Sequence, residues 1–119
     1  MRILVVDDDQ ALNQLICRFL EKNGYEVHSA ADGLQAMDAL ERFHDVGVAI
    51  VDLNMPHVDG IELVKQIKVH PRHKEVPIIM ISASSDEQRV DQSMRSGVGL
   101  FLTKPIDFDH LLGLLRFAG

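Results

Sequence analysis

The sequence predicts an α/β fold: a three-layer αβα sandwich with one five-stranded parallel sheet and five helices. Short apolar runs alternate with segments of helical period along the whole chain. The runs are rich in β-branched residues, as expected for strands covered on both faces. Each connection between runs is long enough for a helix, and such connections join parallel strands. This pattern leaves the order of the strands open.

Length, composition and charge restrict the function classes. At 119 residues, the chain is expected to be one domain spanning residues 1–119. Its net charge of −6 argues against direct binding of nucleic acid. No run approaches the ~20 apolar residues that a membrane-spanning helix needs. The single Cys17 cannot form an internal disulfide, which fits a reducing compartment. We therefore expect a cytoplasmic domain without a membrane partner.

The first predicted strand, residues 3–6, leads into a helix that Asp9 is expected to cap. Gly24 is expected to follow this helix in the left-handed conformation. Cys17 falls off the apolar stripe and is interpreted as a half-exposed thiol without a catalytic role. The stripe at helical spacing consists of Leu12, Leu15, Ile16, Phe19 and Leu20.

The second and third predicted strands are residues 25–30 and 46–51, and the second is the weaker and more mixed in composition. Asp32 and Gly33 make the turn into a short helix between these strands. This helix carries Leu34, Met37 and Leu40. A loop follows the third strand, and the next helix is expected to turn Ile61, Val64 and Ile67 inward.

The last two predicted strands are residues 76–81 and 98–102. The helix between them, for which Ser85 or Asp86 is the expected cap, is polar. Only Val90 and Met94 are expected to point inward, so this helix should dock weakly. Gly97 ends it. The final helix carries Phe108, Leu111, Leu112, Leu115 and Phe117.

Polar residues follow four of the apolar runs. They are Asp7 and Asp8, then Asp52, then Ser82, and finally Thr103 and Lys104. In parallel sheets, the carboxyl ends of the strands share the edge at which ligands bind. Two carboxylates ~4 Å apart repel by about 4 kcal/mol at an effective dielectric of ~20, and one lysine cannot balance three of them. Oxygen ligands of this kind suit Mg²⁺ or Mn²⁺, and a carboxylate beside such an ion can accept a phosphoryl group.

At these motifs the chain resembles the receiver domain of bacterial two-component response regulators. The motifs are Asp7-Asp8, Asp52 with Met55-Pro56 and Gly60, Ser82-Ala83, and Lys104-Pro105. The resemblance runs from end to end, and the four motifs occur in order at the ends of the expected strands. It implies the flavodoxin-like strand order 2-1-3-4-5.

The resemblance also implies the roles of the acidic residues. Asp52 is expected to be the phosphoacceptor. Asp8 and Asp52 are expected to bind Mg²⁺ through their side chains, and Asp7 through a bound water. Asn54 is expected to contribute its backbone carbonyl, and in the family the positions of Asn54 and Ser84 tune the lifetime of the phosphoryl group.

Three further roles come from the same resemblance. Lys104 is expected to pair with the phosphoryl group, and its peptide bond to Pro105 is expected to be cis. Ser82 is expected to move and hydrogen-bond to the phosphoryl group, and Phe101 to rotate inward behind it. Taken alone, Ser82 is a helix cap and Phe101 a core residue.

The leading hypothesis is thus a phosphorylation switch that a histidine kinase or phosphotransfer protein drives. Its only chemistry is phosphotransfer and self-dephosphorylation, so it is not an enzyme with a separate substrate. The surface formed by the fourth helix, the fifth strand and the last helix is expected to bind an effector domain or a second copy of the chain.

Three alternatives stay open. Asp7-Asp8-Asp9 contains the D-x-D of haloacid-dehalogenase-like phosphatases, although Gln10 stands where Thr or Val is usual and the chain has no room for a cap domain. A receiver-like module that has lost phosphorylation would not need the intact acidic set. A flavodoxin-type flavin binder needs a phosphate loop rich in Ser, Thr and Gly, absent here. A zinc site at His70 and His73 is not expected, and His57 and Asp59 are interpreted as solvated loop residues.

Overall fold

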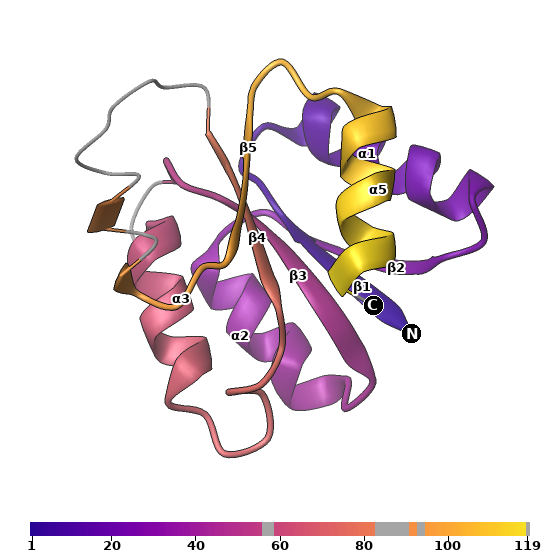
Figure 1. Cartoon of the computed structure of the whole chain (residues 1–119). Helices are drawn as coiled ribbons and strands as arrows, with labels where there is room; N and C mark the ends of the chain where they lie inside the picture. The colour runs from indigo at the N-terminus through magenta and orange to yellow at the C-terminus, as the bar shows by residue number, and fades with distance from the viewer. Residues whose placement is uncertain (56–58, 83–90, 93–94, 119) are drawn as a thin grey trace.

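The structure is a computed structural model that describes residues 1–55, 59–82, 91–92 and 95–118. Within these residues, five strands form one parallel sheet in the order β2-β1-β3-β4-β5 (Figure 1). The strands are β1 (Arg2–Val6), β2 (Glu26–Ala30), β3 (Val46–Asp52), β4 (Ile78–Ser82) and β5 (Leu100–Thr103). The helices with described bounds are α1 (Gln10–Lys22), α2 (Gly33–Arg42), α3 (Gly60–Lys68) and α5 (Phe108–Ala118). The predicted parallel sheet and its order 2-1-3-4-5 are confirmed.

Helices cover both faces of the sheet (Figure 1). α1 and α5 lie on one face, and α2 and α3 lie on the other. Because side chains alternate along a strand, each central strand contributes to both layers of core. In β1, Leu4 and Val6 pack toward α2 and α3, whereas Ile3 and Val5 pack toward α1 and α5. This two-sided burial explains why the central strands appear in the sequence as unbroken apolar runs.

Three strands end later than the sequence predicted. β3 includes Asp52, β4 includes Ser82, and β5 extends to Thr103. The ladder explains the difference, since Asp52 pairs with Ile81 and Ser82 pairs with Thr103. Asp52 and Ser82 therefore belong to the sheet and not to the loops that follow it.

Aspartates cap the four helices whose bounds are described. Asp9, Asp32, Asp59 and Asp107 each accept a hydrogen bond from the backbone N–H three residues later. The prediction for Asp9 is confirmed, whereas the interpretation of Asp59 as a solvated loop residue is wrong. Gly24, which follows the C-cap residue of α1, has φ of 88°, as predicted.

The inward faces of three helices differ from the predicted stripes. Leu15 is 53% exposed, Leu34 is 68% exposed and Phe117 is 82% exposed, so these three predictions are wrong. In α1, the face toward the sheet carries Asn13, Ile16 and Leu20, spaced at i, i+3 and i+7. A flat sheet contacts a narrower arc of the helix than the predicted stripe covered. The inward positions predicted for the helix after Asp59 are confirmed, because Ile61, Val64 and Ile67 are buried.

Most of the predicted fourth helix lies outside the described residues. Its expected cap at Ser85 or Asp86, its inward residues Val90 and Met94, and the predictions for His57 and Ser84 all belong to the part that is not described. Residues 91, 92 and 95 are helical. Among the described residues, no helix has the length and hydropathy needed to span a membrane.

Candidate functional site

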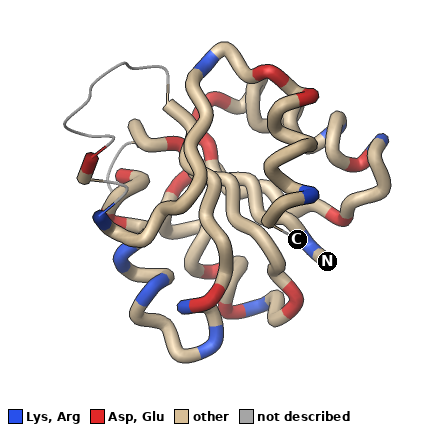
Figure 2. The backbone as a smooth tube through the Cα atoms, in the orientation of Figure 1, with Lys and Arg blue, Asp and Glu red and all other residues tan. Residues whose placement is uncertain are grey.

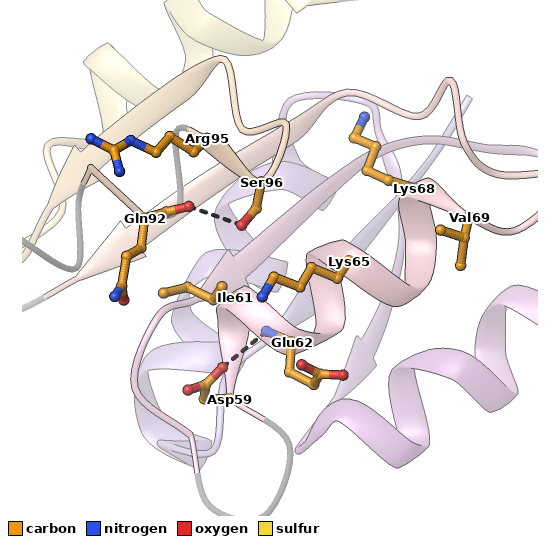
Figure 3. A pocket seen from close by; sticks show the side chains of 9 residues that line it. All are labelled: Asp59, Ile61, Glu62, Lys65, Lys68, Val69, Gln92, Arg95 and Ser96. Atoms are coloured by element: carbon orange, nitrogen blue, oxygen red, sulfur yellow. Dashed lines mark hydrogen bonds between the residues drawn. The ribbon is translucent and has the colours of Figure 1, made fainter.

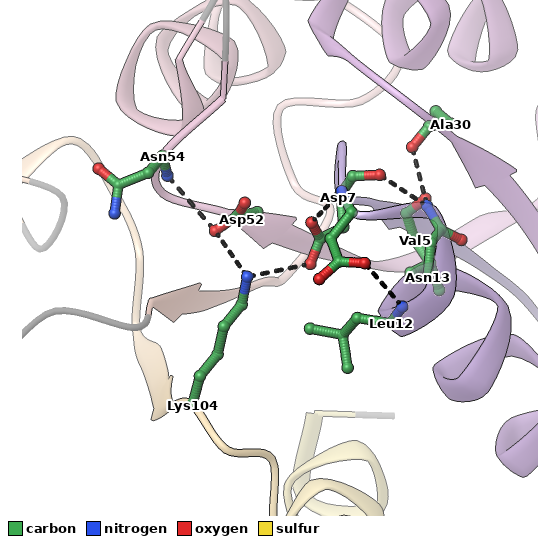
Figure 4. A network of polar contacts seen from close by, with 9 residues as sticks. Val5, Asp7, Leu12, Asn13, Ala30, Asp52, Asn54 and Lys104 are labelled. Atoms are coloured by element: carbon green, nitrogen blue, oxygen red, sulfur yellow. Dashed lines mark hydrogen bonds and ion pairs between the residues drawn. The ribbon is translucent and has the colours of Figure 1, made fainter.

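The carboxyl edge of the sheet gathers charged side chains from three strands (Figure 4). Asp7 follows β1, Asp52 ends the neighbouring β3, and Lys104 follows β5. The Nζ atom of Lys104 lies 3.3 Å from Oδ2 of Asp7 and 3.5 Å from Oδ1 of Asp52. Carboxylate oxygens of Asp7, Asp8 and Asp52 all lie within 4.8 Å of one another. The structure thus brings together residues that are far apart in the sequence.

Asp7 is fully buried, and its two carboxylate oxygens differ. Oδ1 accepts a hydrogen bond from the backbone N–H of Asp9 at 2.9 Å. Oδ2 is buried and accepts no hydrogen bond from the residues that the structure describes, although it forms the ion pair with Lys104. A buried carboxylate oxygen without a hydrogen bond lowers the stability of the fold unless another cation or hydrogen-bond donor contacts it.

Asp52 is 3% exposed, and its Oδ1 accepts a long hydrogen bond, 3.4 Å, from the backbone N–H of Asn54. Burial and the negative charge of Asp7 raise the pKa of Asp52 to about 7, although Lys104 and the Asn54 N–H oppose the shift. The ionised carboxylate is therefore held at high free energy, as expected for a reactive group and not for a structural one.

Lys104 links this cluster to the sheet. Its backbone N–H donates to the carbonyl of Ser82 at 2.7 Å, so the ends of β4 and β5 fix its position. Burial disfavours its charged form, but the carboxylates of Asp52 and Asp7 outweigh burial and raise the pKa of Lys104. The Lys104–Pro105 peptide bond is cis, as predicted.

The donor set fits a divalent cation. Three carboxylates face one ammonium, so the cluster keeps net negative charge when all three acids are ionised. The available ligands are oxygens, which Mg²⁺ and Mn²⁺ prefer. A bound cation would also stabilise the buried Oδ2 of Asp7, which accepts no hydrogen bond from the described residues.

One buried polar residue of this region, Asn13, was not predicted from the sequence. It is 5% exposed, and its side-chain amide contacts backbone carbonyls beside the cluster (Figure 4). The available signal was its spacing, because Asn13 lies three residues before Ile16 and seven before Leu20 on the buried face of α1. A polar residue at such a position needs partners inside the protein.

Comparison with known families decides the classification. The family model for the response regulator receiver domain matches residues 3–116. This chain belongs to that family. Receiver domains are the phosphoacceptor switches of two-component signalling, so the chain is a phosphoacceptor switch.

Individual relatives agree with this assignment. The chain is 38% identical over 106 residues to the chemotaxis protein CheY1 of Helicobacter pylori, covering 88% of this chain and 86% of the relative. It is 34% identical to the DNA-binding regulator RpaA of Synechocystis over 97% of this chain, but the match spans only 47% of that protein. The solved structure of Vibrio cholerae CheY4 superimposes with a TM-score of 0.93 at 30% identity and covers 99% of this chain and 98% of that one.

The two expected switch residues of this receiver domain lie on neighbouring strands. Ser82 ends β4 and is fully buried. Phe101 lies on β5, is partly buried, and packs against the core layer under α2 and α3. Asn54 lies two residues after Asp52 and is exposed. Ser82 therefore lies at the same edge of the sheet as Asp52 and Lys104, whereas Phe101 belongs to the core.

Two hollows of the receiver domain differ in their relation to the cluster. One, of about 700 Å³, lies between α3 and the residues Gln92, Arg95 and Ser96, and none of the cluster residues lines it (Figure 3). Within it, Asp59 caps α3 and the Ser96 hydroxyl donates to the Gln92 carbonyl. The other hollow, of about 290 Å³, has Asp7 and Asn13 in its wall. Only the second therefore borders the candidate site.

Proposed function

We propose that this receiver domain accepts a phosphoryl group on Asp52 from a histidine kinase or phosphotransfer protein in a Mg²⁺-dependent reaction. The observation that carries the proposal is the buried Asp52 carboxylate, which lies beside two further carboxylates and 3.5 Å from a lysine ammonium. A structural ion pair would not gather three acids around one cation. The proposal covers residues 1–119 as one domain, and a cytoplasmic location stays a prediction.

We assign Asp7, Asp8 and Asp52, with the backbone carbonyl of Asn54, as the residues that would hold Mg²⁺ or Mn²⁺. When bound, such an ion neutralises carboxylate charge and attracts the oxygens of a phosphoryl group. The support is the all-oxygen donor set and the buried Oδ2 of Asp7.

The protein's own residues supply the rest of the chemistry. An ionised Asp52 oxygen forms the new bond to phosphorus, while the bond from phosphorus to the donor histidine nitrogen breaks and that nitrogen keeps the electron pair. Lys104, anchored through its backbone at the end of β4, is placed to pair with phosphoryl oxygens. Self-dephosphorylation would be the attack of water on the same phosphorus, with Asp52 as the leaving group.

Phosphorylation would then be read out through Ser82 and Phe101. The added phosphoryl charge attracts the Ser82 hydroxyl and Lys104, and Phe101 repacks behind them toward the surface formed by the fourth helix, β5 and α5. A bias of ~3 kcal/mol between two conformations changes their population ratio by more than a hundredfold. That surface is the proposed contact for an effector domain or a second copy, without direct binding of nucleic acid.

The phosphatase alternative loses its main support. Its D-x-D motif would need Asp9 as a second catalytic carboxylate beside Asp7. Instead, Asp9 caps α1 by accepting from the Leu12 N–H, and it is not part of the carboxylate cluster.

A labelling experiment tests the proposal. The wild-type chain, Asp52→Asn and the control Asp45→Asn are incubated with Mg²⁺ and a small-molecule phosphodonor, and intact mass is measured. We expect a single phosphoryl adduct on the wild type and on Asp45→Asn, because Asp45 is exposed and pairs with Arg2 at the other end of the sheet. Equal labelling of Asp52→Asn would contradict the assignment of the acceptor.

A further inference from the structure

The side chain of Asn13 connects α1 to the ends of two strands. Its Nδ2 atom lies 3.1 Å from the Asp7 carbonyl, 3.0 Å from the Ala30 carbonyl and 3.4 Å from the Val5 carbonyl (Figure 4). An amide nitrogen carries only two hydrogens, so these three acceptors share them. The residue is 5% exposed, which leaves the carbonyls little access to water as a substitute partner.

These contacts complete the immobilisation of Asp7. Its backbone N–H donates to the Ala30 carbonyl at 3.1 Å, and its own carbonyl accepts from Asn13. Its carboxylate Oδ1 accepts from the Asp9 N–H. Backbone and carboxylate are thus held on three sides. The other carboxylate oxygen, Oδ2, accepts no hydrogen bond from the described residues and belongs to the cluster with Asp52 and Lys104.

We propose that Asn13 is a positioning residue for the acidic site, because its amide holds the Asp7 main chain and so presents the Asp7–Asp8 carboxylates to the cation. The inference rests on the proposed function, since it assumes that these carboxylates bind Mg²⁺. Asn13 does not itself touch the reacting atoms. It acts through Asp7, as partners of metal ligands do in other proteins when they fix the orientation of a ligand.

The alternative is that Asn13 only stabilises the fold. The two roles differ in what a substitution changes. A purely structural residue would lower the melting temperature but leave the folded fraction with wild-type affinity for Mg²⁺. A positioning residue would weaken binding in the folded protein, and partners of this kind typically contribute about 10- to 100-fold in metal affinity.

The test is a Mg²⁺ titration of the full chain, followed through backbone amide shifts, with the phosphodonor reaction measured at low and saturating Mg²⁺. For Asn13→Leu, which keeps the volume and loses both donors, we expect about tenfold weaker binding or more. Its labelling rate should fall at low Mg²⁺ and recover at saturation. Asn13→Ser keeps one shorter hydrogen-bond donor and should give a smaller loss of Mg²⁺ affinity. If Asn13→Leu does not fold, Asn13→Ser still tests the inference.

Two controls separate the explanations. Ile67→Val truncates a fully buried residue of α3 far from the cluster and should lower stability without changing Mg²⁺ affinity. Cys17→Ala removes the thiol that donates to Oδ1 of Asn13 but leaves the Nδ2 contacts, so its affinity should also stay at the wild-type value. Wild-type affinity in a folded Asn13 variant would overturn the inference and leave the proposed function intact. A wild-type chain that binds no Mg²⁺ would overturn both.

Discussion

The charged residues at the two ends of the sheet differ in burial and in net charge. At the amino end, Arg2 pairs with Asp45 at 3.0 Å, and Glu41 accepts from both Arg72 and His70 at 2.9 Å and 2.8 Å. The carboxylates of these pairs are exposed, and Figure 2 shows both signs of charge interspersed at the lower end of the molecule. At the carboxyl end, three acids share one ammonium, and two of the acids are buried.

This difference separates charges that serve the fold from charges that serve the reaction. In an exposed ion pair, each charge is neutralised by its partner, and such pairs contribute little to stability. Buried like charges are destabilising, and a protein retains them where a cation or substrate completes the site. Whether a cluster of charged residues serves the fold or the reaction therefore depends on its burial and on its net charge. Substitutions at the two ends should reproduce the contrast.

The largest effect on the rate of phosphorylation is expected from removing the lysine charge at the carboxyl end of the sheet. Lys104→Met should lower the rate of phosphorylation by a small-molecule donor by about a hundredfold or more, because a preorganised charge on the transferred group is lost. Arg72→Met removes a cation at the amino end and should leave the rate unchanged. The measurement is the time course of phosphoryl adduct formation at saturating Mg²⁺. Equal losses in both variants would mean that the ends do not differ in function.

The next effect concerns pH and stability in metal-free buffer. The pKa of Asp52 is about 7 in the folded chain and near 3.8 in the unfolded chain, so between these values only the folded state keeps the proton. Stability should therefore fall as pH rises from about 4 to 7, at up to about 1.4 kcal/mol per pH unit and by a few kcal/mol in total. Asp52→Asn should lack this fall and be the more stable protein at neutral pH.

Urea unfolding at about pH 5 and about pH 8 measures this difference. Asp45→Asn serves as the control, because Asp45 is exposed and its pKa is lowered by the hydrogen bond from Arg2, so it cannot produce a loss of stability in this range. Parallel unfolding curves for wild type and Asp52→Asn at both pH values would show that Asp52 is not held at high free energy.

A stability effect without a functional effect is expected at the amino end. His73 is 2% exposed, and its Nε2 atom lies 2.7 Å from the Leu40 carbonyl, which ties the loop before β4 to α2. His73→Ala leaves this carbonyl unpaired and opens a cavity, so the free energy of unfolding should drop by about 2–3 kcal/mol. Phosphoryl labelling of the folded protein should persist at the wild-type rate. The exposed His110→Ala is the matched control and should change neither quantity.

The sequence predicted the carboxyl end better than the amino end. Asp7, Asp52 and Lys104 each follow an unbroken apolar run, and parallel strands necessarily bring such positions to one edge. The strand order could not be deduced in this way and came from family resemblance, because right-handed crossovers permit several orders. Asn13 escaped prediction since its acceptors lie on other elements: Val5 and Asp7 at the end of β1, and Ala30 at the end of β2. A local pattern does not indicate whether a polar side chain will find buried acceptors.

The amino end shows the same limit. His73 lies in a polar stretch between Pro71 and Val76, and nothing in that stretch indicates burial, yet its side chain is buried against a carbonyl 33 residues away. Asp59 was interpreted as solvated although it caps α3, because the boundary of that helix was not placed at Gly60. A tertiary contact determines the role of His73, and a helix boundary determines that of Asp59. The residue type alone suggested exposure in both cases.

The smallest expected effect is at Glu41, and its pH dependence has the opposite sign to that of Asp52. The hydrogen bond from His70 and the charge of Arg72 hold the pKa of Glu41 below its ordinary value. The ionised carboxylate therefore stabilises the fold above the unfolded pKa of 4.5, and this contribution is lost as pH falls through the lower folded pKa. Glu41→Gln should give a small drop in melting temperature at neutral pH that shrinks with added salt and vanishes in acid. A drop that grows toward acid pH would instead place Glu41 with the strained carboxylates of the other end.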